Sequence, residues 1–161
     1  AGYHQYEISN VARMGRTSSH NLKYCTDGEW LGFGCGAHST RNGFRWRNVA
    51  ATMEYVRRVG EATSVSAERR VMSVDERLEE ALFTGLRLTE GLDLPAIAAR
   101  YSVDVWGRYG SELQRFLDAG LLQHRPGQRL ALTRSGMLLA NEVMAVFIGT
   151  DTRDPRRASC A

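Results

Sequence analysis

Between Ser18 and Thr40 the sequence reads SSHNLKYCTDGEWLGFGCGAHST, which gathers side chains able to bind iron or a flat ring. The candidate ligands in this stretch are His20, His38, Cys25, Cys35 and Tyr24. Imidazole, thiolate and phenolate groups are all known donors to heme iron. The histidines are 18 residues apart and the cysteines 10 apart, and neither spacing matches a known metal motif. Spacing alone therefore leaves two interpretations open for each side chain, a ligand or an ordinary surface or core residue.

A glycine-spaced loop, GFGCGAHS, follows these residues. Gly32, Gly34 and Gly36 could let a ligand approach the main chain closely, because glycine has no Cβ. The alternative is a structural turn, which the spacing alone favours, since no strand-to-helix dinucleotide-binding context surrounds the loop.

Composition and charge are those of an ordinary globular protein. Apolar residues make up 43% and charged residues 24%, and the formal net charge is +3. Three cysteines form neither a disulfide framework nor a CxxC pair, which favours a reducing compartment. No apolar run has the length of a transmembrane helix, and the start resembles no signal peptide. We therefore expect a cytoplasmic protein without a transmembrane segment. Because the sequence begins with Ala1 rather than Met, in the middle of a pattern, we also expect it to be part of a longer chain.

The first half predicts short strands and loops. Alternation of apolar and polar residues over 3–8 favours a strand, and residues 13–21 have the composition of a loop. The apolar run at 29–34 is predicted to be a short strand that leads into a glycine-spaced turn. A helix over residues 49–60 is expected to be capped by Asn48 and stopped by glycine. Residues 61–73 are expected to form a polar connector.

The second half predicts helices and a hairpin. Ser73 and Glu76 have capping-box spacing before an apolar helical face formed by Leu78, Ala81, Leu82 and Leu86. Further expected elements are a helix after Asp93, a helix over residues 111–120, a hairpin turned at Pro126-Gly127 and a final helix over residues 134–148. This order is that of a winged-helix domain, and the remaining residues have the composition of a loose terminus.

A winged-helix order raises the possibility of DNA binding. The candidate recognition helix, however, carries Glu112 and Asp118 against a single Arg115, and this sign of charge would repel phosphates. We therefore expect no nucleic-acid partner and favour packing of this helix against another domain. The terminal RDPRR cluster is more typical of a solvated tail than of a site.

Several stretches together resemble a known family. In chain order, these are GYHQYEISNVA, HNLKY, LGFGCGAHS, GLRLTEGL, and GLL followed by LALTRSGMLLANEV. They resemble the C-terminal part of the oxygen-independent coproporphyrinogen III oxidase-like radical SAM family, from Gly2 to about Ile148. The HN-x-x-Y signature is similar to the heme-chaperone branch, HemW, because the corresponding loop of the coproporphyrinogen dehydrogenases does not carry it.

The resemblance implies roles for individual residues. His20, Asn21 and Tyr24, with Cys25 beside them, would belong to a heme-holding loop in which His20 is our choice of iron ligand. Tyr6, Glu7 and Ser9 would end one of the last strands of the radical SAM barrel and contribute to its cofactor site. The part of the glycine loop implied to lie beside S-adenosylmethionine comprises Gly32, Gly34, Gly36, Ala37 and His38.

The sequence also departs from the family pattern. Cys25 stands where the signature continues with tryptophan, and Cys35 stands where the glycine loop usually has proline. No CxxxCxxC is present to hold the [4Fe-4S] cluster that cleaves S-adenosylmethionine. We therefore expect the chain to be inactive in radical chemistry on its own and to need a missing N-terminal radical SAM half.

The resulting expectation is an α+β fold in three parts. Residues 1–60 would be the last strands of a partial radical SAM (β/α) barrel, residues 61–150 a winged-helix-like domain, and residues 151–161 a flexible tail. The expected function is that of the C-terminal portion of a heme chaperone, which binds heme and passes it to acceptor proteins. The alternatives are the same portion of a coproporphyrinogen III dehydrogenase, against which HNLKY argues, and a winged-helix nucleic-acid binder.

Overall fold

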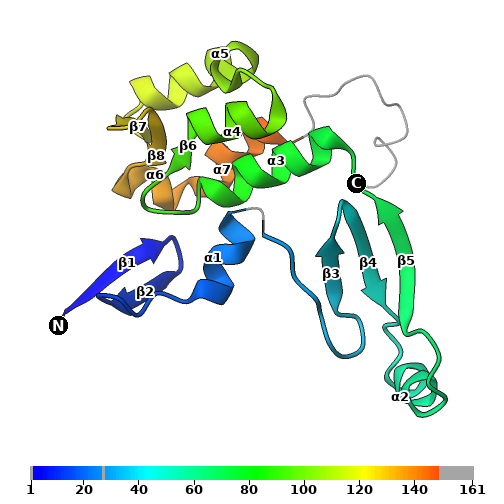
Figure 1. Ribbon diagram of the computed structural model, residues 1–161. Coiled ribbons are helices and arrows are strands. Elements are labelled where there is room, and N and C mark those ends of the chain that lie inside the picture. The colour runs from blue at the N-terminus through cyan, green and yellow to red at the C-terminus, as the bar shows by residue number, and fades with distance from the viewer. Residues whose placement is uncertain (1, 27, 149–161) are drawn as a thin grey trace.

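The computed structural model describes residues 2–26 and 28–148 and divides into a helical unit and a smaller N-terminal part (Figure 1). In the helical unit, three helices precede a β-hairpin, and two short helices with a final 3-10 turn follow it. The elements are α3 (Val74–Gly85), β6 (Leu92–Asp93), α4 (Leu94–Tyr101), α5 (Val105–Asp118), β7 (Leu122–Arg125), β8 (Arg129–Leu132), α6 (Arg134–Leu138), α7 (Ala140–Met144) and η1 (Ala145–Phe147). The three strands form one antiparallel sheet in the order β6-β8-β7.

Helix α3 begins at a complete capping box. The Ser73 hydroxyl accepts from the Glu76 amide, and the Glu76 carboxylate accepts from the Ser73 amide, so two otherwise unpaired amides are satisfied. The apolar face of α3 then packs into the protein's one continuous apolar core among the described residues. Its fully buried side chains include Leu82, Leu86, Tyr109, Leu113, Leu130, Leu132, Val143, Met144 and Phe147.

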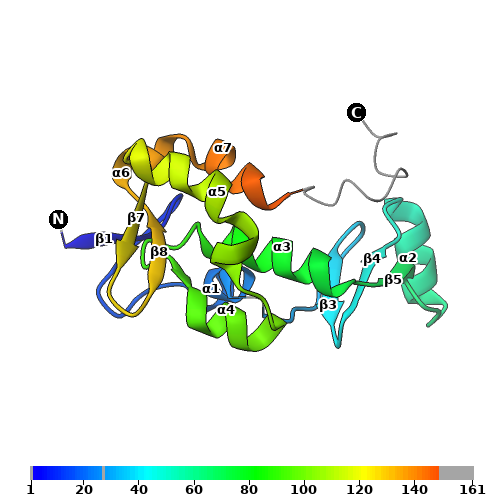
Figure 2. The same cartoon turned by 90° about the horizontal axis from the view of Figure 1, so that it is seen from above.

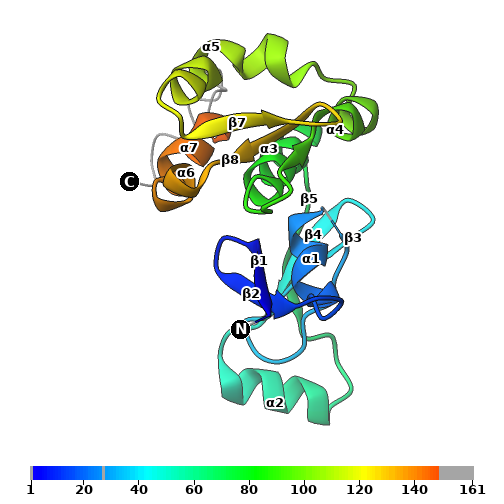
Figure 3. The ribbon, with the colours of Figure 1, turned by 90° about the vertical axis from the view of Figure 1, so that its left-hand side faces the viewer.

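The N-terminal part is built from two antiparallel sheets and two helices. A hairpin of β1 (Tyr3–Glu7) and β2 (Asn10–Arg13) precedes helix α1 (Ser19–Cys25). A three-stranded sheet, β3 (His38–Arg41), β4 (Phe44–Asn48) and β5 (Ser66–Val71), follows, with helix α2 (Thr52–Gly60) between its last two strands. Figure 1 and Figure 2 place α1 between the hairpin and this sheet. Helix α2 lies at the end away from the helical unit (Figure 3).

This N-terminal part has almost no apolar core of its own. The buried side chains before residue 60 are small or polar: Glu7, Ala12, Cys25, Ser39 and Asn48. Helix α2 buries none of its residues, and Met53, Val56 and Val59 on it are exposed. Apolar burial, the main driving force of folding, is therefore concentrated in the helical unit.

Polar contacts join the two parts. Strand β1 continues its pairing onto the residues after α3: the Ile8 amide donates to the Arg87 carbonyl at 3.0 Å, and the Thr89 amide donates to the Tyr6 carbonyl at 3.1 Å. Beside them, the Glu7 carboxylate is 1% exposed and accepts from Arg87 Nε at 2.7 Å. The hairpin is thus fixed to the end of α3 by main-chain and side-chain contacts together.

Several sequence-based expectations are confirmed. The strand at the start, the capping box of α3, the helix after Asp93 and the hairpin at Pro126-Gly127 are all present. An α+β class is correct as well, although every strand pair among the described residues is antiparallel. Strand β5 belongs to the sheet of β3 and β4, so that sheet extends past the expected domain boundary at residue 60.

Other expectations were wrong, each for a local reason. The HNLKYC segment is a helix and not a loop, because Ser18 caps it. Residues 66–71 form an edge strand and not a connector, since an edge tolerates the charged residues that suggested a loop. Asn48 does not cap α2, whose N-cap is Ala51. Helix α5 begins at Val105, earlier than expected.

The expected final helix is interrupted. Leu139 leaves helical geometry, and this divides residues 134–148 into α6, α7 and a 3-10 turn. The break accompanies a close contact of α6, where a Cβ on Gly136 would lie 1.9 Å from the Leu121 carbonyl. The expected tail, residues 151–161, lies outside the described residues. Among the helices of residues 2–26 and 28–148, none is long and apolar enough to cross a membrane.

Limited proteolysis should reveal the unequal distribution of the core. We expect low concentrations of trypsin to cut the intact chain first before Met72 and to leave a resistant fragment that contains residues 78–147, because most of the buried apolar side chains lie there. Mass spectrometry of the digest identifies the fragment. Preferential survival of residues 2–60 would contradict this distribution.

Replacing Glu7 should weaken the junction in a pH-dependent way. Burial alone would raise the pKa of Glu7, but hydrogen bonds from Asn10, Ser9 and Arg87 outweigh it and hold this pKa below 4.5. The ionised carboxylate therefore stabilises the fold above pH 4.5, and this contribution is lost as pH falls through the lowered pKa. We expect Glu7→Gln to lower the free energy of unfolding at pH 7 by about 1–3 kcal/mol.

Urea unfolding followed by tryptophan fluorescence at pH 7 and pH 3.5 measures this effect. The difference between Glu7→Gln and the unmodified chain should shrink at the lower pH. Glu142→Gln, at an exposed position, is the matched control and should change little at either pH. An equal loss at both pH values would mean that the charge of Glu7 is not what stabilises the junction.

Candidate functional site

The HN-x-x-Y segment forms helix α1, and its side chains separate onto two sides of that helix. The Ser18 hydroxyl accepts from the Asn21 amide at 3.2 Å and starts the helix. His20 and Tyr24 are one helical turn apart, and the Tyr24 hydroxyl lies 3.2 Å from His20 Nε2. The two rings meet edge to face with centroids 5.1 Å apart, and the Tyr24 ring also contacts Trp30 at 4.7 Å. A His-Tyr-Trp cluster therefore forms on the outer side of α1.

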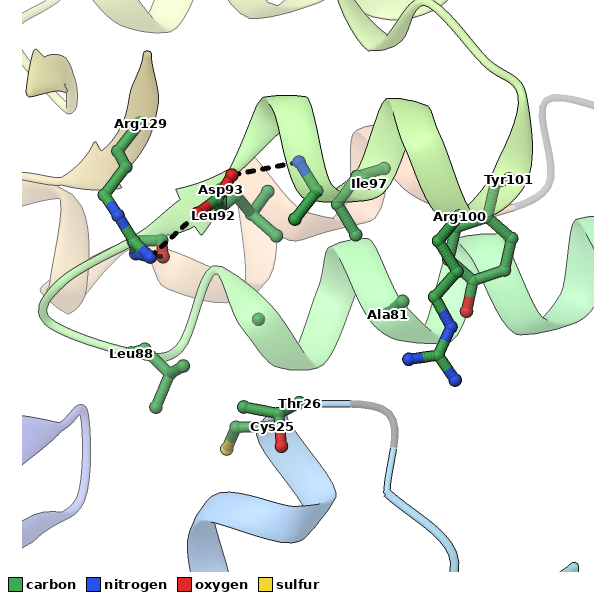
Figure 4. A pocket seen from close by; sticks show the side chains of 13 residues that line it. Cys25, Thr26, Ala81, Leu88, Leu92, Asp93, Ile97, Arg100, Tyr101 and Arg129 are labelled. Atoms are coloured by element: carbon green, nitrogen blue, oxygen red, sulfur yellow. Dashed lines mark hydrogen bonds and ion pairs between the residues drawn. The ribbon is translucent and has the colours of Figure 1, made fainter. Parts of the chain in front are cut away.

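Cys25 lies on the other side of the helix. It is 6% exposed and packs toward α3, where Figure 4 shows its thiol at the end of α1. Burial raises the pKa of the Cys25 thiol, and the negative charge of Glu7 raises it further. Five residues separate His20 from Cys25, or roughly 140° around the helix axis. The two side chains therefore do not face one common iron position.

Asn21, the remaining member of the signature, is partly buried. Its Oδ1 atom is enclosed and has no hydrogen-bond partner within the described ranges. Asn21 and Cys25 are four residues apart and so share a side of α1. The signature thus contributes the exposed His20 and the half-buried Tyr24 to the outer side of α1, and Asn21 to the packed side.

An open hollow adjoins the His-Tyr-Trp cluster. Trp30 is positioned by two hydrogen bonds with Thr40, each 3.0 Å long, and the Arg45 guanidinium lies 5.6 Å from its ring centre. The hollow combines apolar and cationic side chains, and we name it the α1 hollow. Its lining consists of His20, Lys23, Glu29, Trp30, Leu31, Phe33, Thr40 and Arg41. Phe33 is 85% exposed and Leu31 48% exposed, so a broad apolar surface is open to a ligand.

The glycine loop is closed by its own hydrogen bonds. The Gly32 amide donates to Ser39 Oγ at 2.9 Å, and the Gly34 amide donates to the Tyr55 hydroxyl at 3.1 Å. Asn48 Nδ2 donates to the Gly34 carbonyl at 2.9 Å and, at 3.3 Å, to the Gly32 carbonyl. The Gly36 amide is also engaged, with the Val49 carbonyl as acceptor.

The backbone of the loop requires glycine at each of these three positions. Gly34 and Gly36 have φ of +99° and +70°, which favour glycine, and a Cβ on Gly32 would lie 2.3 Å from the His38 carbonyl. Because all three amides already have acceptors, they do not fit a role as free donors to S-adenosylmethionine. Of the neighbouring candidates, His38 is exposed and Ala37 half-buried.

Tyr6, Glu7 and Ser9 lie apart from the glycine loop. They belong to the hairpin that pairs with the end of α3, and α1 separates this hairpin from the sheet that carries the loop (Figure 1). The Glu7 carboxylate is fully engaged, with the Ser9 amide at 2.9 Å and Asn10 Nδ2 at 2.6 Å as further donors. The structure therefore does not bring all of the expected cofactor residues into one cavity.

Metal-ligating groups are also dispersed. Residues 2–26 and 28–148 contain no group of three or more His, Cys, Asp or Glu side chains placed to hold a metal ion. The residues present do not fit an iron-sulfur cluster. A heme iron is a different case, because the porphyrin supplies four nitrogens and the protein one or two axial ligands.

Sequence reasoning missed several lining residues of the α1 hollow. Lys23 and Arg41 are the cations, and Trp30, Leu31 and Phe33 supply the apolar surface. The alternation of apolar residues with glycine at 30–34 was a signal for this exposed surface, although we took it for a strand entering a turn. Asn48 and Tyr55, which close the glycine loop, had no such signal, because their partners are main-chain groups distant in sequence.

Comparisons with known proteins agree with this architecture. Residues 72–139 match the family model of the HemN C-terminal domain. The chain is 36% identical over 148 residues to the heme chaperone HemW of Bacillus subtilis (strain 168), covering 92% of this chain and 39% of that protein. It is 34% identical over 149 residues to HemW of Mycobacterium tuberculosis (strain ATCC 25618 / H37Rv), covering 92% and 36%. The chain thus spans less than two fifths of these relatives' lengths.

A solved structure shows the same fold. The coproporphyrinogen III oxidase HemN from Escherichia coli, described as a radical SAM enzyme, superposes with a TM-score of 0.69 over 91% of this chain and 37% of that one, at 17% identity. The chain therefore belongs to the HemW/HemN radical SAM family and corresponds to the C-terminal portion of its members.

Proposed function

We propose that this chain is the C-terminal portion of a heme chaperone and that heme, its cargo, binds in the α1 hollow before transfer to an acceptor protein. The observation that carries the proposal is the His20-Tyr24-Trp30 cluster beside exposed Leu31 and Phe33. A porphyrin needs a flat apolar surface, an iron ligand and cations for its propionates, and this hollow offers all three.

His20 is the iron ligand in this proposal. Its Nε2 atom is engaged by the Tyr24 hydroxyl, so coordination through Nε2 requires that this hydrogen bond be broken. Tyr24 then serves to orient the imidazole in the absence of heme and becomes free to contact the porphyrin. Cys25 has no part in coordination, because it is buried on the opposite side of α1 with its thiol protonated.

Lys23 and Arg41 are proposed to bind the propionates. Both are exposed on the rim of the hollow. Arginine binds carboxylates through two parallel N–H groups, which makes Arg41 the more specific of the two. Glu29 on the same rim accepts from the Asn42 amide and thereby holds the β3–β4 turn next to Arg41.

S-adenosylmethionine and the [4Fe-4S] cluster would be held by the N-terminal radical SAM half of a longer protein. For this chain we propose only that the exposed His38, with Ala37, borders the S-adenosylmethionine site, since the loop amides have internal acceptors. We likewise interpret the helical unit as a winged helix, with β7 and β8 as the wing, and the N-terminal strands as an extension of the barrel sheet.

Two other functions are less well supported. A coproporphyrinogen III dehydrogenase shares the fold, but the HN-x-x-Y signature and its solvent-facing histidine favour heme binding. A nucleic-acid binder would need an excess of cations on α5, but its two arginines, Arg108 and Arg115, are balanced by Glu112 and Asp118, and Arg108 is paired with Asp75. An electrophoretic mobility shift at low salt tests the latter, and we expect no shift.

Substitutions on α1 should separate the roles of its residues. With the chain joined to its N-terminal half, we expect His20→Ala to lower heme affinity at least tenfold, since it removes the iron bond, and Cys25→Ser to leave the absorption spectrum unchanged. Tyr24→Phe should bind heme with the spectrum of a histidine ligand, because it removes only the competing hydrogen bond. Soret titration measures all three.

Three results would contradict these roles of the α1 residues. If Cys25→Ser alone loses heme, or if His20→Ala and Cys25→Ser both bind it normally, the assignment of α1 is wrong. If Tyr24→Phe changes the Soret position as His20→Ala does, the phenolate and not the imidazole ligates the iron.

The propionate contact has its own test. Arg41→Gln should weaken heme binding about five- to tenfold, as expected for a partly exposed charge-assisted pair, and should not affect the dimethyl ester of heme, which lacks the carboxylates. Arg16→Gln, an exposed arginine outside the hollow, is the matched control. Equal weakening of heme and its ester by Arg41→Gln would remove Arg41 from this role.

A further inference from the structure

A pocket lies on the side of α1 opposite the α1 hollow, between the C-terminal end of α1 and helices α3 and α4 (Figure 4). Its volume is about 190 Å³, and its described lining residues are all different from those of the α1 hollow. We name it the α1–α4 pocket. Its apolar walls include Cys25, Ala81, Leu88, Leu92, Ile97 and Tyr101.

The walls of this pocket are fixed by the fold. Ala81, Leu92 and Tyr101 are buried members of the core, so they do not rearrange freely. Gly85 lets α1 approach α3, because a Cβ there would lie 2.6 Å from Leu92 Cδ2 and 3.5 Å from the Cys25 carbonyl. The pocket is therefore preformed, as small-molecule sites usually are.

The charged side chains around the pocket are already engaged within the protein. Asp93 accepts from Arg129 Nη2 at 3.2 Å and, as the cap of α4, from the Ala96 amide at 2.9 Å. Arg100 has an interaction of its own, and its guanidinium lies 5.8 Å from the centre of the Tyr101 ring. A charged ligand would lose its hydration here and would find no free counter-ion among the described lining residues.

The α1 side of the pocket is neutral. Burial raises the pKa of the Cys25 thiol, and the negative charge of Glu7 raises it further, so the thiol is protonated at pH 7. The Thr26 hydroxyl donates to the Leu22 carbonyl at 2.8 Å. The pocket thus offers apolar contact to a ligand and asks for no charge in return.

We propose that the α1–α4 pocket binds a small neutral aromatic molecule of about the size of toluene. An apolar cavity of about 150 Å³ holds benzene, so this pocket accommodates one ring with a short apolar substituent and excludes a porphyrin. The Tyr101 ring in its wall adds the edge or face contact that aromatic pairs prefer.

Binding at this position acts on α1. The ligand contacts the end of α1 on one side and α3 and α4 on the other, so it binds only when α1 is docked on the helical unit. A ligand that binds the folded chain alone stabilises it by mass action. The inference does not depend on heme binding.

The test uses toluene and benzoate as probes on the intact chain without heme. We expect toluene to shift the NMR methyl signals of Leu88 and Ile97 in a saturable way and to raise the unfolding temperature. Benzoate has the same ring but carries a charge, and it should bind at least tenfold more weakly.

A matched pair of variants locates the binding. Ala96 and Ala99 are both exposed on α4, but only Ala96 lines the pocket. Ala96→Trp places an indole at the mouth of the pocket and should lower toluene affinity at least tenfold, whereas Ala99→Trp should leave it unchanged. Circular dichroism checks that both variants are folded.

A third variant keeps the proposal testable if Ala96→Trp disturbs α4. Ile97→Ala enlarges the pocket and should bind naphthalene at least tenfold more tightly than the unmodified chain does. The proposal is overturned if toluene gives no saturable shift, or if benzoate binds as tightly as toluene. It is also overturned if Ala96→Trp and Ala99→Trp bind toluene equally well.

Discussion

The buried carboxylate of Glu7 is the contact on which the placement of the β1–β2 hairpin depends. It binds Arg87 at the end of α3 and, through Asn10 and the Ser9 amide, fixes the turn of its own hairpin. A buried charge is costly unless every lone pair is used, and here all of its donors come from the two parts being joined. The junction is therefore specific in geometry and sensitive to the loss of any one partner, unlike the apolar core of residues 78–147, which has many redundant contacts.

Helix α1 docks directly against α3 and has two different sides as a result. Seven residues are too few for a stable isolated helix, so α1 depends on docking against α3. Docking uses Cys25 and the side that carries Asn21, which leaves His20 exposed and Tyr24 half-buried between His20 and Trp30 on the outer side. A signature that appears in sequence as one cluster is thus divided by helical geometry into a packing half and an exposed half.

Local signals in the sequence predicted the helical unit well. The capping box at Ser73, the helix start after Asp93 and the Pro126-Gly127 turn involve residues within four positions of each other, and each was confirmed. The N-terminal half depends instead on distant partners, such as the pairing of β5 with β4, which composition could not indicate. One local signal was overlooked: Asn42 and Gly43, both with positive φ, form the two-residue turn between β3 and β4. Asn48 satisfies main-chain carbonyls as a donor, whereas a cap would have used it as an acceptor.

An open site is physically suited to a cargo that must be released. Affinity among related complexes is set mainly by the dissociation rate, and burial of the ligand slows dissociation. In the α1 hollow Phe33 is largely exposed and the cations lie on the rim, so one face of a bound porphyrin would remain accessible to a partner protein. The hydrogen bond between the Tyr24 hydroxyl and His20 Nε2 competes with iron for this nitrogen, and it reforms as heme leaves. On our proposal, the same residues that capture heme therefore also favour its transfer, without any movement of the rigid helical unit.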